Sequence, residues 1–455
     1  MEAKDVKTIS DAMAIIDERG LSHVKVGLFD NDGVMRGKYM SRAKFESSLN
    51  NGFSFCDVVL GWDVKDQLYD NAEFTGWHTG YPDAQVRILP DTCRDVFGED
   101  GMLLFLEEFC GAAEKVCPRG LLRRVLKQAE DLGLKVSAAL EYEFFLFNET
   151  PHSDREKAFR NLESFTPDWF GYSVIRNSVH SDLYESMLAM GETMNFPIEG
   201  LRTETGAGVI EAAITVDDAL NAADKAALFK TFTKVWAQKN SLLATFMAKW
   251  SGDYPGQSGH IHLSLQDDKG EAVFYDHNQP NNMSQIQSQF LAGQQQLMSE
   301  FLCLITPTIN SYTRMVPGYW APTSATWGVE NRTTALRVIS GSSKSQRIEY
   351  RLAAADANPY LALAAAIASG LYGVTNKLQP SEAIVGNAYD QAQDQKFQLP
   401  CTLWEAAQKL RASKAAKMMF GQEFVNHFAS SREWEEREFR KHVTDWEMER
   451  YFEII

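Results

Sequence analysis

The sequence predicts an α+β protein in which helices cover one face of a sheet and charged residues occupy the other. Three strand-like segments place ionisable side chains at every second position: Glu141-Tyr142-Glu143, His260-Ile261-His262 and Arg347-Ile348-Glu349-Tyr350-Arg351. Residues i and i+2 of a strand point to the same face, and burial of an unpaired charge costs several kcal/mol or more. Such a face therefore has to enclose ions. Stretches with helical periodicity at residues 217–239, 284–304 and 359–369 supply the helices.

Length and charge restrict the class of protein. The 455 residues are enough for two domains with substantial cores. A formal net charge of −16 argues against nucleic acid as a partner, because the chain has no basic stripe for a phosphate backbone. The six cysteines lack metal-binding spacing, and the longest apolar run, residues 361–368, is far shorter than the roughly 20 residues of a membrane span. We expect a cytoplasmic protein without a membrane partner.

The region before about residue 110 has a pattern of short, strand-like segments. Residues 24–29, the turn Asp30-Asn31-Asp32-Gly33 and residues 34–40 are typical of a hairpin with an Asp-Gly turn. The pattern changes around Cys117-Pro118-Arg119-Gly120, after which residues 121–129 form an amphipathic helical pattern. We place a domain boundary near residue 115, which gives domains 1–115 and 116–455.

The helix at residues 359–369 has the clearest ends. Asn358 is the expected N-cap, and Pro359 suits the first helical position, where its missing N–H would be unpaired in any case. Gly370 follows the last expected residue, as C-terminal glycines often do. The helix is therefore predicted to stop before Gly370.

Carboxylates and imidazoles on the charged face predict a metal site. Glu141 and Glu143 share a strand face and would repel each other unless a cation lay between them. Glu204 and Glu211 flank the small residues 205–208, which allow the backbone to fold tightly and bring both acids together. A solvated strand face and a plain surface loop are the respective alternatives. After the loop that contains Gly256, one of the two histidines can ligate metal while the other, or Ser264, reaches a phosphate.

Arginines gather between residues 314 and 351, and Arg347, Glu349 and Arg351 alternate along one strand. Guanidinium groups clamp phosphate or carboxylate in a bidentate manner, whereas the carboxylate suits Mg²⁺ or Mn²⁺. A salt-bridge ladder between subunits is the structural alternative. Together with the acids, these residues predict an ATP-dependent, metal-assisted transfer site.

The charged segments resemble, in the same order, those of the glutamine synthetase superfamily. The resemblance covers most of the chain and rests on Cys117-Pro118-Arg119, Glu141-Tyr142-Glu143, Glu204 to Glu211, Gly259-His260-Ile261-His262-Leu263-Ser264, Asn310-Ser311-Tyr312-Thr313-Arg314, Trp327-Gly328-Val329-Glu330-Asn331-Arg332, Arg347-Ile348-Glu349-Tyr350-Arg351 and Asn358-Pro359-Tyr360. It implies a small β-grasp-like N-terminal domain, a large catalytic domain with a curved antiparallel sheet, and a homo-oligomer, typically a dodecamer of two hexameric rings with active sites between subunits.

The resemblance also implies roles for individual residues. Two or three Mg²⁺ or Mn²⁺ ions would be held in each site, one by Glu143, Glu204 and Glu211 and another by Glu141, His260 and Glu349. Glutamate would be bound by Gly256, Arg314 and Arg351. ATP would contact Glu199, His262, Ser264, Arg337, Lys344 and Arg347, with Arg332 on the transferred phosphoryl group. Such enzymes phosphorylate the γ-carboxylate of glutamate and let a nitrogen nucleophile displace the phosphate.

One departure from the family pattern concerns the nitrogen substrate. Ammonia-using members carry a glutamate where this chain has Trp320, within Val316-Pro317-Gly318-Tyr319-Trp320-Ala321-Pro322. An indole cannot accept a proton from ammonium, although its face attracts cations and its area favours carbon. The aspartate that completes the ammonium pocket also lacks a clear counterpart, and either Asp57 or Asp63 could supply it.

These departures resemble the γ-glutamylpolyamine and γ-glutamylamine synthetases, which act in amine catabolism. We expect a ligase that joins glutamate to a polyamine or a monoamine, and Trp320, Trp327 and Trp62 favour a monoamine or a mixed preference. The alternatives are an ammonia-using glutamine synthetase and a member that has lost catalysis and serves in assembly or nitrogen sensing. All six predicted metal positions keep suitable donors, which argues against the last.

Overall fold

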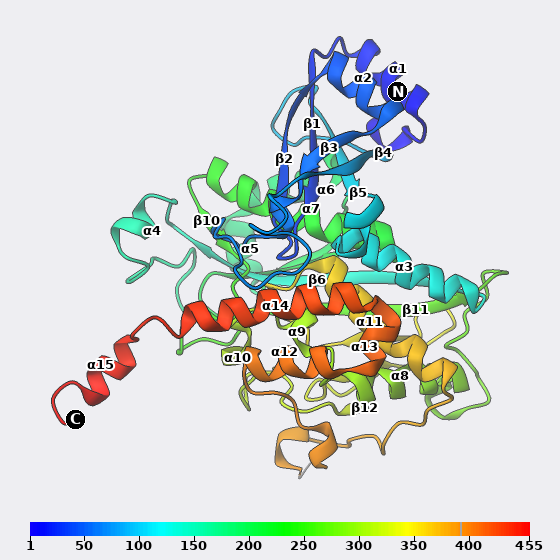
Figure 1. Ribbon diagram of the computed structural model, residues 1–455. Helices are drawn as coiled ribbons and strands as arrows, with labels where there is room; N and C mark the ends of the chain where they lie inside the picture. Colours follow the sequence, from blue (N-terminus) through cyan, green and yellow to red (C-terminus); the bar gives the residue numbers. More distant parts are fainter. Residues whose placement is uncertain (392–393) are drawn as a thin grey trace.

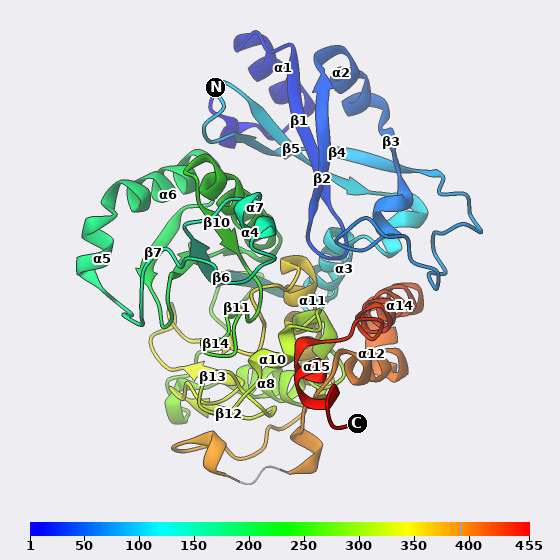
Figure 2. The ribbon, with the colours of Figure 1, turned by 90° about the vertical axis from the view of Figure 1, so that its left-hand side faces the viewer.

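The computed structural model describes residues 1–391 and 394–455. Its N-terminal part is built on a five-stranded sheet, drawn from blue to cyan in Figures 1 and 2. In sheet order the strands are β2 (Met35–Ser41), β1 (His23–Phe29), β5 (Leu103–Phe109), β4 (Asp83–Asp95) and β3 (Phe53–Cys56). β1 and β5 run parallel at the centre and the other pairs are antiparallel. The predicted hairpin is confirmed, since β1 and β2 pair from His23 with Ser41 to Phe29 with Met35.

Two helices in this region were not predicted: α1 (Ile9–Glu18) and α2 (Arg42–Asn51). Both have a clear N-terminal signal, because the Thr8 side chain accepts from the amide of Asp11 in a capping box and the Ser41 side chain accepts from that of Lys44. The expectation that only strands precede residue 110 is therefore wrong. The cap residues Thr8 and Ser41 are present in the sequence, but the neighbouring segments alternate apolar and polar residues, a pattern that favours strands over helices.

Two successive glutamates of β5 have opposite environments. Glu107 is 2% exposed and neither carboxylate oxygen has a hydrogen-bond partner. Burial raises its pKa to about 8, and Lys38 lowers it only partly. Glu108 points to the other face, where Arg87, Arg119 and Arg123 contact it. Burial raises the pKa of Glu108, but the arginines outweigh this and leave it lowered.

Replacing Glu107 by glutamine should remove a large part of the pH dependence of stability. The folded chain keeps this proton up to about pH 8, whereas the unfolded chain releases it near pH 4.5, so stability falls as pH rises between these values. The free energy of unfolding of the parent should lose on the order of 3 kcal/mol from this group between pH 5 and 7, and Glu107→Gln should not. Urea unfolding at several pH values measures this. The control Glu108→Gln should instead destabilise the protein at pH 7, and equal pH slopes for parent and Glu107→Gln would contradict the assignment.

The central sheet has nine strands, and the predicted site lies on its charged face. Its main path runs β12 (Trp327–Val329), β13 (Leu336–Ile339), β14 (Arg347–Tyr350), β11 (Gly259–Asp267), β6 (Leu134–Phe147), β8 (Val209–Ile214) and β7 (Ile198–Thr203), and β9 (Asp217–Asp218) and β10 (Leu243–Thr245) pair with β6. All pairs are antiparallel except β12 with β13. This confirms the predicted α+β class.

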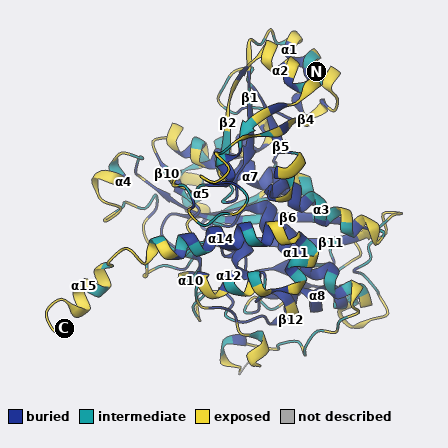
Figure 3. Cartoon of the chain, viewed as in Figure 1, coloured by how far each residue is buried: buried dark blue, intermediate teal, exposed yellow. Residues whose placement is uncertain are grey.

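Helices cover the apolar face of this sheet and form the main core. Tyr142 of β6, Ile261 of β11 and Tyr350 of β14 are at most 2% exposed and belong to the same core cluster as the helices. The packed helices are α3 (Pro118–Asp131), α7 (Ala219–Lys239), α8 (Gln285–Leu297) and α11 (Pro359–Thr375), which appear dark blue where they are buried in Figure 3. The alternation predicted from the sequence thus separates an apolar face from a charged one.

Helix α11 continues past Gly370 to Thr375, so the predicted stop is wrong. A Cβ at Gly370 would lie 2.2 Å from the Phe290 ring, and one at Gly373 would lie 2.0 Å from the Gln289 carbonyl oxygen. These glycines allow α11 and α8 to approach closely. The two glycines allow the helices to pack closely and do not end α11. The sequence of α11 alone does not reveal this role, because it depends on contacts with α8.

The predicted helix 284–304 is divided into α8 and α9 (Leu302–Ile305). Lys409 donates to the Ser299 hydroxyl at 2.6 Å, and the Ser413 hydroxyl donates to Glu300, so the C-terminal helices hold the intervening turn.

The remaining helices are α4 (Ser153–Glu156), α5 (Val174–Val179), α6 (Ser181–Thr193), α10 (Ser311–Arg314), α12 (Leu403–Ala412), α13 (Lys414–Phe420), α14 (Gln422–Phe439) and α15 (Asp445–Tyr451). Helix α15 projects from the body (Figure 1). In the described part of the chain, no helix has the length and apolarity to span a membrane.

Candidate active site

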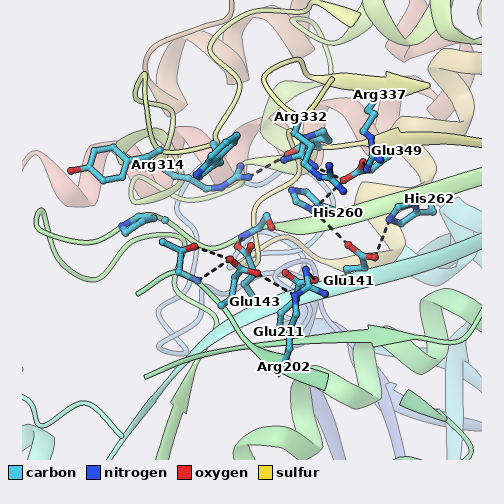
Figure 4. A pocket seen from close by; sticks show the side chains of 18 of the residues that line it. Glu141, Glu143, Arg202, Glu211, His260, His262, Arg314, Arg332, Arg337 and Glu349 are labelled. Atoms are coloured by element: carbon cyan, nitrogen blue, oxygen red, sulfur yellow. Dashed lines mark hydrogen bonds and ion pairs between the residues drawn. The ribbon is translucent and has the colours of Figure 1, made fainter. Parts of the chain in front are cut away.

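The charged face of the central sheet opens into a cavity of about 510 Å³. Its lining includes most of the predicted site residues: Glu141, Glu143, Glu204, Glu211, Gly256, His260, His262, Arg314, Trp320, Arg332, Arg337, Arg347, Glu349 and Arg351. Figure 4 shows the labelled side chains converging, among them Glu141 and Glu143 of β6, Glu211 of β8, His260 and His262 of β11, Arg337 of β13 and Glu349 of β14. Segments more than 200 residues apart in the sequence therefore meet at one place, as Glu141 and Glu349 do.

Strand register explains this convergence. His260 of β11 is paired with Glu141 of β6, and Glu143 of β6 is paired with Glu211 of β8. On the other side of β11, Glu349 of β14 faces both His262 and Arg337. Paired residues of an antiparallel ladder lie on the same face, so five strands place acids, imidazoles and a guanidinium side by side.

Glu141, His262 and Glu349 offer ligand atoms that all lie within 4.8 Å of one another, and they are the one such trio of histidine, cysteine and acidic residues in the described chain. His260 lies beside them, with Nδ1 3.5 Å from Glu349 and 3.8 Å from Glu141. Burial lowers the pKa of His260, which favours the neutral ring that metal binding requires. The donors fit a hard divalent cation.

The two histidines differ in their second partner. Arg347 Nε donates to His262 Nδ1 at 3.2 Å, which places the ring proton on Nε2, the atom 3.2 Å from Glu141. His262 in that tautomer has no free lone pair for a metal. This arrangement is compatible with the predicted division, in which His260 ligates metal and His262 joins Arg347 near the nucleotide.

Glu349 is the most heavily contacted acid of the cavity. Arg337 Nη1 lies 3.0 Å from it, and Arg351 also forms an ion pair with it. Burial raises its pKa, but the neighbouring His260 and His262 rings and the guanidinium groups of Arg351 and Arg337 outweigh burial and bring the pKa down to about 2. Glu349 is therefore a carboxylate at any physiological pH.

The predicted glutamate-binding residues lie together. Arg314, 2% exposed, donates to the carbonyl oxygens of Leu352 at 2.9 Å and Arg351 at 3.2 Å. Burial lowers its pKa to about 10, so the guanidinium remains charged at neutral pH. A Cβ at Gly256 would lie 2.5 Å from Arg314 Cγ, which explains why glycine occupies this position.

Glu143, Glu204 and Glu211 form what we call the acidic subsite. Glu143 accepts from the amide of Ser258 at 2.6 Å, and Glu211 is 3% exposed. Burial and the neighbouring Glu143 raise the pKa of Glu211 to about 9. Arg202 lies against Glu204 and Glu211, and sequence reasoning missed it. Its signal was its position on the strand two residues before Glu204, opposite Glu211.

A second cavity of about 300 Å³ adjoins the first through Glu141, His262 and Arg347, which line both. It brings together five of the residues predicted for ATP: Glu199, His262, Ser264, Lys344 and Arg347. The sixth, Arg337, lines the main cavity beside Arg332.

Tyr172, Pro255, Tyr319 and Trp320 form the apolar part of the main cavity. Trp320 is 57% exposed, and the loop after it is held by the Tyr389 hydroxyl, which donates to the Ala321 carbonyl at 2.9 Å. In the described chain, the carboxylates that line this cavity are those of Glu141, Glu143, Glu211 and Glu349 on the strands and of Glu204, directly after β7. The loop of Tyr319 and Trp320 thus contributes no acid to the lining.

Two other tryptophans were wrongly associated with the substrate. Trp327 is 9% exposed and donates to the Ser381 carbonyl, and Trp62 lies under the guanidinium of Arg36. Neither lines the main cavity. Asp57 accepts from Thr75, and Asp63 accepts from the amides of Lys65 and Gln67, so both acids are bound within their own chain.

Known proteins with similar sequences and folds match almost the whole chain. A model of the glutamine synthetase catalytic domain matches residues 115–451. Type-1 glutamine synthetase 2 of Dictyostelium discoideum is 45% identical over 438 residues, which cover 95% of this chain and 84% of that protein. Glutamate–isopropylamine ligase of Pseudomonas sp is 36% identical over 461 residues, with 100% of both chains covered. A solved structure of GmaS without ligand has the same fold, with a TM-score of 0.84, 24% identity and coverage of 97% and 99%.

Proposed function

The chain belongs to the glutamine synthetase family, and from this premise we propose that it is an ATP-dependent ligase that joins L-glutamate to an organic amine in amine catabolism. The choice of an organic amine over ammonia rests on the position of Trp320 in the cavity. This indole lines the cavity at the sequence position where ammonia-using members carry the acid that deprotonates ammonium. A large apolar surface there favours a nucleophile that bears carbon.

The proposed reaction has two steps. An oxygen of the glutamate γ-carboxylate attacks the γ-phosphorus of ATP, which releases ADP and leaves γ-glutamyl phosphate. The neutral amine then attacks the carbonyl carbon of the acyl phosphate, phosphate leaves with the bonding electron pair, and the new amide nitrogen loses a proton. Bound Mg²⁺ or Mn²⁺ would neutralise phosphate charge, and the donors around Glu141 and Glu349 would hold it. Arg332 and Arg337 are the proposed contacts of the transferred phosphoryl group, since guanidinium groups stabilise the charge it carries.

The aromatic part of the cavity supports a monoamine over a polyamine. A polyamine bound through one nitrogen carries a second ammonium group, which needs a carboxylate several ångströms away. In the described chain, the five lining carboxylates belong to the strands or, for Glu204, to the residue directly after β7, and the loop of Tyr319 and Trp320 adds none. The relative that ligates isopropylamine, by its name, acts on a small apolar monoamine. We propose a monoamine with an apolar or weakly polar substituent.

A second candidate is an ammonia-using glutamine synthetase. The relative from Dictyostelium discoideum bears the name of a glutamine synthetase and is 45% identical. Both candidates share the glutamate and ATP steps and differ in the nucleophile alone. The contacts around Trp320 therefore distinguish an organic amine from ammonia as the nucleophile.

An amine panel tests the proposal. Phosphate release is followed with glutamate, ATP and ammonia, methylamine, isopropylamine, ethanolamine or putrescine at equal concentrations of free base. We expect kcat/KM for the best monoamine to exceed that for ammonia by about tenfold or more, the difference that a few buried carbon atoms produce in an apolar pocket. Trp320→Glu should raise kcat/KM for ammonia and lower that for monoamines, whereas the matched control Trp404→Glu, at another exposed indole, should change neither. Ammonia as the best substrate of the parent would exclude the amine assignment.

We also propose a homo-oligomer, a dodecamer of two hexameric rings with active sites between subunits. The exposed apolar side chains of the C-terminal segment support association, since Trp446, Phe452, Ile454 and Ile455 are between 58% and 95% exposed. Figure 3 shows this segment in yellow beyond the body. A neighbouring copy that covered the open side of the cavity would exclude water from the acyl phosphate.

A further inference from the structure

Arg202 contacts two of the three acids of the acidic subsite, Glu204 and Glu211. Its Nη2 is 2.6 Å from Glu211 Oε1, and its Nε is 3.2 Å from Glu204 Oε2. The backbone sets this position, because Arg202 of β7 is paired with Glu211 of β8 across the ladder. Figure 4 shows the Arg202 side chain reaching up from β7 to the carboxylates.

The guanidinium is also held from the opposite side. Its central carbon lies 4.7 Å from the centroid of the Tyr172 ring, a cation–π contact. The amide of Tyr172 donates to the Thr203 carbonyl at 2.8 Å, which ties the backbone at this position to β7, while the residue is 68% exposed. The two carboxylates and the ring together orient the planar guanidinium.

This location conflicts with the metal site predicted for Glu143, Glu204 and Glu211. Two of the three proposed ligands already contact an arginine, whose guanidinium cannot lose its charge in a protein. A divalent ion placed among the same oxygens would meet Arg202 at a few ångströms, where like charges repel strongly in a partly buried site. The residues as arranged do not fit a divalent ion together with Arg202.

The other predicted metal site, formed by Glu141, His260 and Glu349, differs in one respect. Arg337 and Arg351 contact Glu349, but in the described chain the ion-pair partners of Glu141 are the imidazoles of His260 and His262, not a lysine or an arginine. Glu141 and His260 are thus open to a divalent ion, whereas two acids of the acidic subsite are held by one arginine.

We propose that Arg202 is a built-in cation of the acidic subsite, so that a divalent ion enters this subsite only when the guanidinium is displaced. The chain then binds divalent ions in two classes of unequal affinity, a tight class at Glu141 and Glu349 and a weak class at the acidic subsite. The proposal concerns metal binding by the protein without substrates. It is independent of whether the nitrogen substrate is an amine or ammonia.

Titration of the metal-free full-length protein with Mn²⁺, with free Mn²⁺ followed by electron paramagnetic resonance, tests the proposal. The parent should show two classes whose dissociation constants differ by about tenfold or more. Arg202→Met keeps the length of the side chain without its charge and should tighten the weak class by about tenfold, so that the two classes merge. Arg202→Lys keeps a charge and should retain the weak class.

The matched control is Arg176→Met. Arg176 also lies over an aromatic ring, that of Phe170 at 5.3 Å, but its guanidinium donates to backbone carbonyls and to Thr166 instead of acids. This variant should bind Mn²⁺ as the parent does. Two equally tight classes in the parent, or an unchanged weak class in Arg202→Met, would overturn the proposal.

A second measurement covers the case in which Arg202→Met folds poorly. Without metal, this variant should melt at a lower temperature than the parent, because Glu204 and Glu211 lose their counter-charge. Saturating Mn²⁺ should restore its melting temperature by more than it raises that of the parent. Destabilisation that Mn²⁺ does not correct would assign Arg202 a purely structural role.

Discussion

Replacing Glu349 by glutamine should lower kcat by about a thousandfold or more, because it removes the ionised carboxylate around which the cavity is organised. Its side chain contacts Arg337 at 3.0 Å, pairs with Arg351 and lies 3.5 Å from His260. The amide has nearly the same shape but no charge, so it leaves two guanidinium groups uncompensated and is a poor ligand for a divalent cation. Phosphate release at saturating glutamate, ATP and amine measures the loss.

The matched control for this prediction is Glu330→Gln. Glu330 also pairs with Arg337, but its side chain is 47% exposed and it does not line the main cavity. We expect less than a tenfold change in kcat for it, as for an exposed ion pair. If Glu349→Gln kept more than a tenth of the parent's kcat while remaining folded, Glu349 would have no direct part in the reaction.

Replacing Arg314 by methionine should raise KM for glutamate by about a hundredfold and change KM for ATP by less than threefold. The buried guanidinium is oriented by the carbonyls of Leu352 and Arg351, which leaves its other donors for a substrate carboxylate. Hydrogen bonds between charged groups are worth roughly 1.5 to 3 kcal/mol each, enough for a change of this size. Initial rates with one substrate varied at a time separate the two constants.

Two further variants complete this test. Thr313→Ala changes the neighbouring exposed residue of α10 and should leave both KM values unchanged. Arg314→Lys keeps the charge without the planar fork and should lie between the parent and Arg314→Met. A parallel rise of KM for ATP in Arg314→Met would indicate a general disturbance of the site instead of a lost contact with glutamate.

Much of the fold was predictable because short-range patterns reflect it directly. The alternation around Glu141, His260 and Glu349 determined which side chains point into the cavity, and a strand has no other way to arrange residues i and i+2. The Asp-Gly turn likewise predicted the hairpin of β1 and β2. Failures occurred where a residue's role depends on a partner far along the chain. Gly370 packs against Phe290, a contact that local helix-end rules do not contain.

The candidate site divides in the same way. Arg202 carries no motif, and only the pairing of β7 with β8 places it opposite Glu211 and next to Tyr172. Trp320, Trp327 and Trp62 are equivalent as sequence letters, yet only the first lines the main cavity while the other two are packed elsewhere. Composition identifies candidates for binding, and tertiary contacts select among them.

The sequence by itself determined the fold class, the family and the kinds of side chain available for the chemistry, because periodicity and ordered motifs are properties of local chain segments. Only the tertiary structure decided which of those side chains meet, that an arginine contacts two acids of one subsite, and which tryptophan lines the main cavity. The reason is physical: charges act over a few ångströms in space, and the distance between two residues along the chain does not specify that separation.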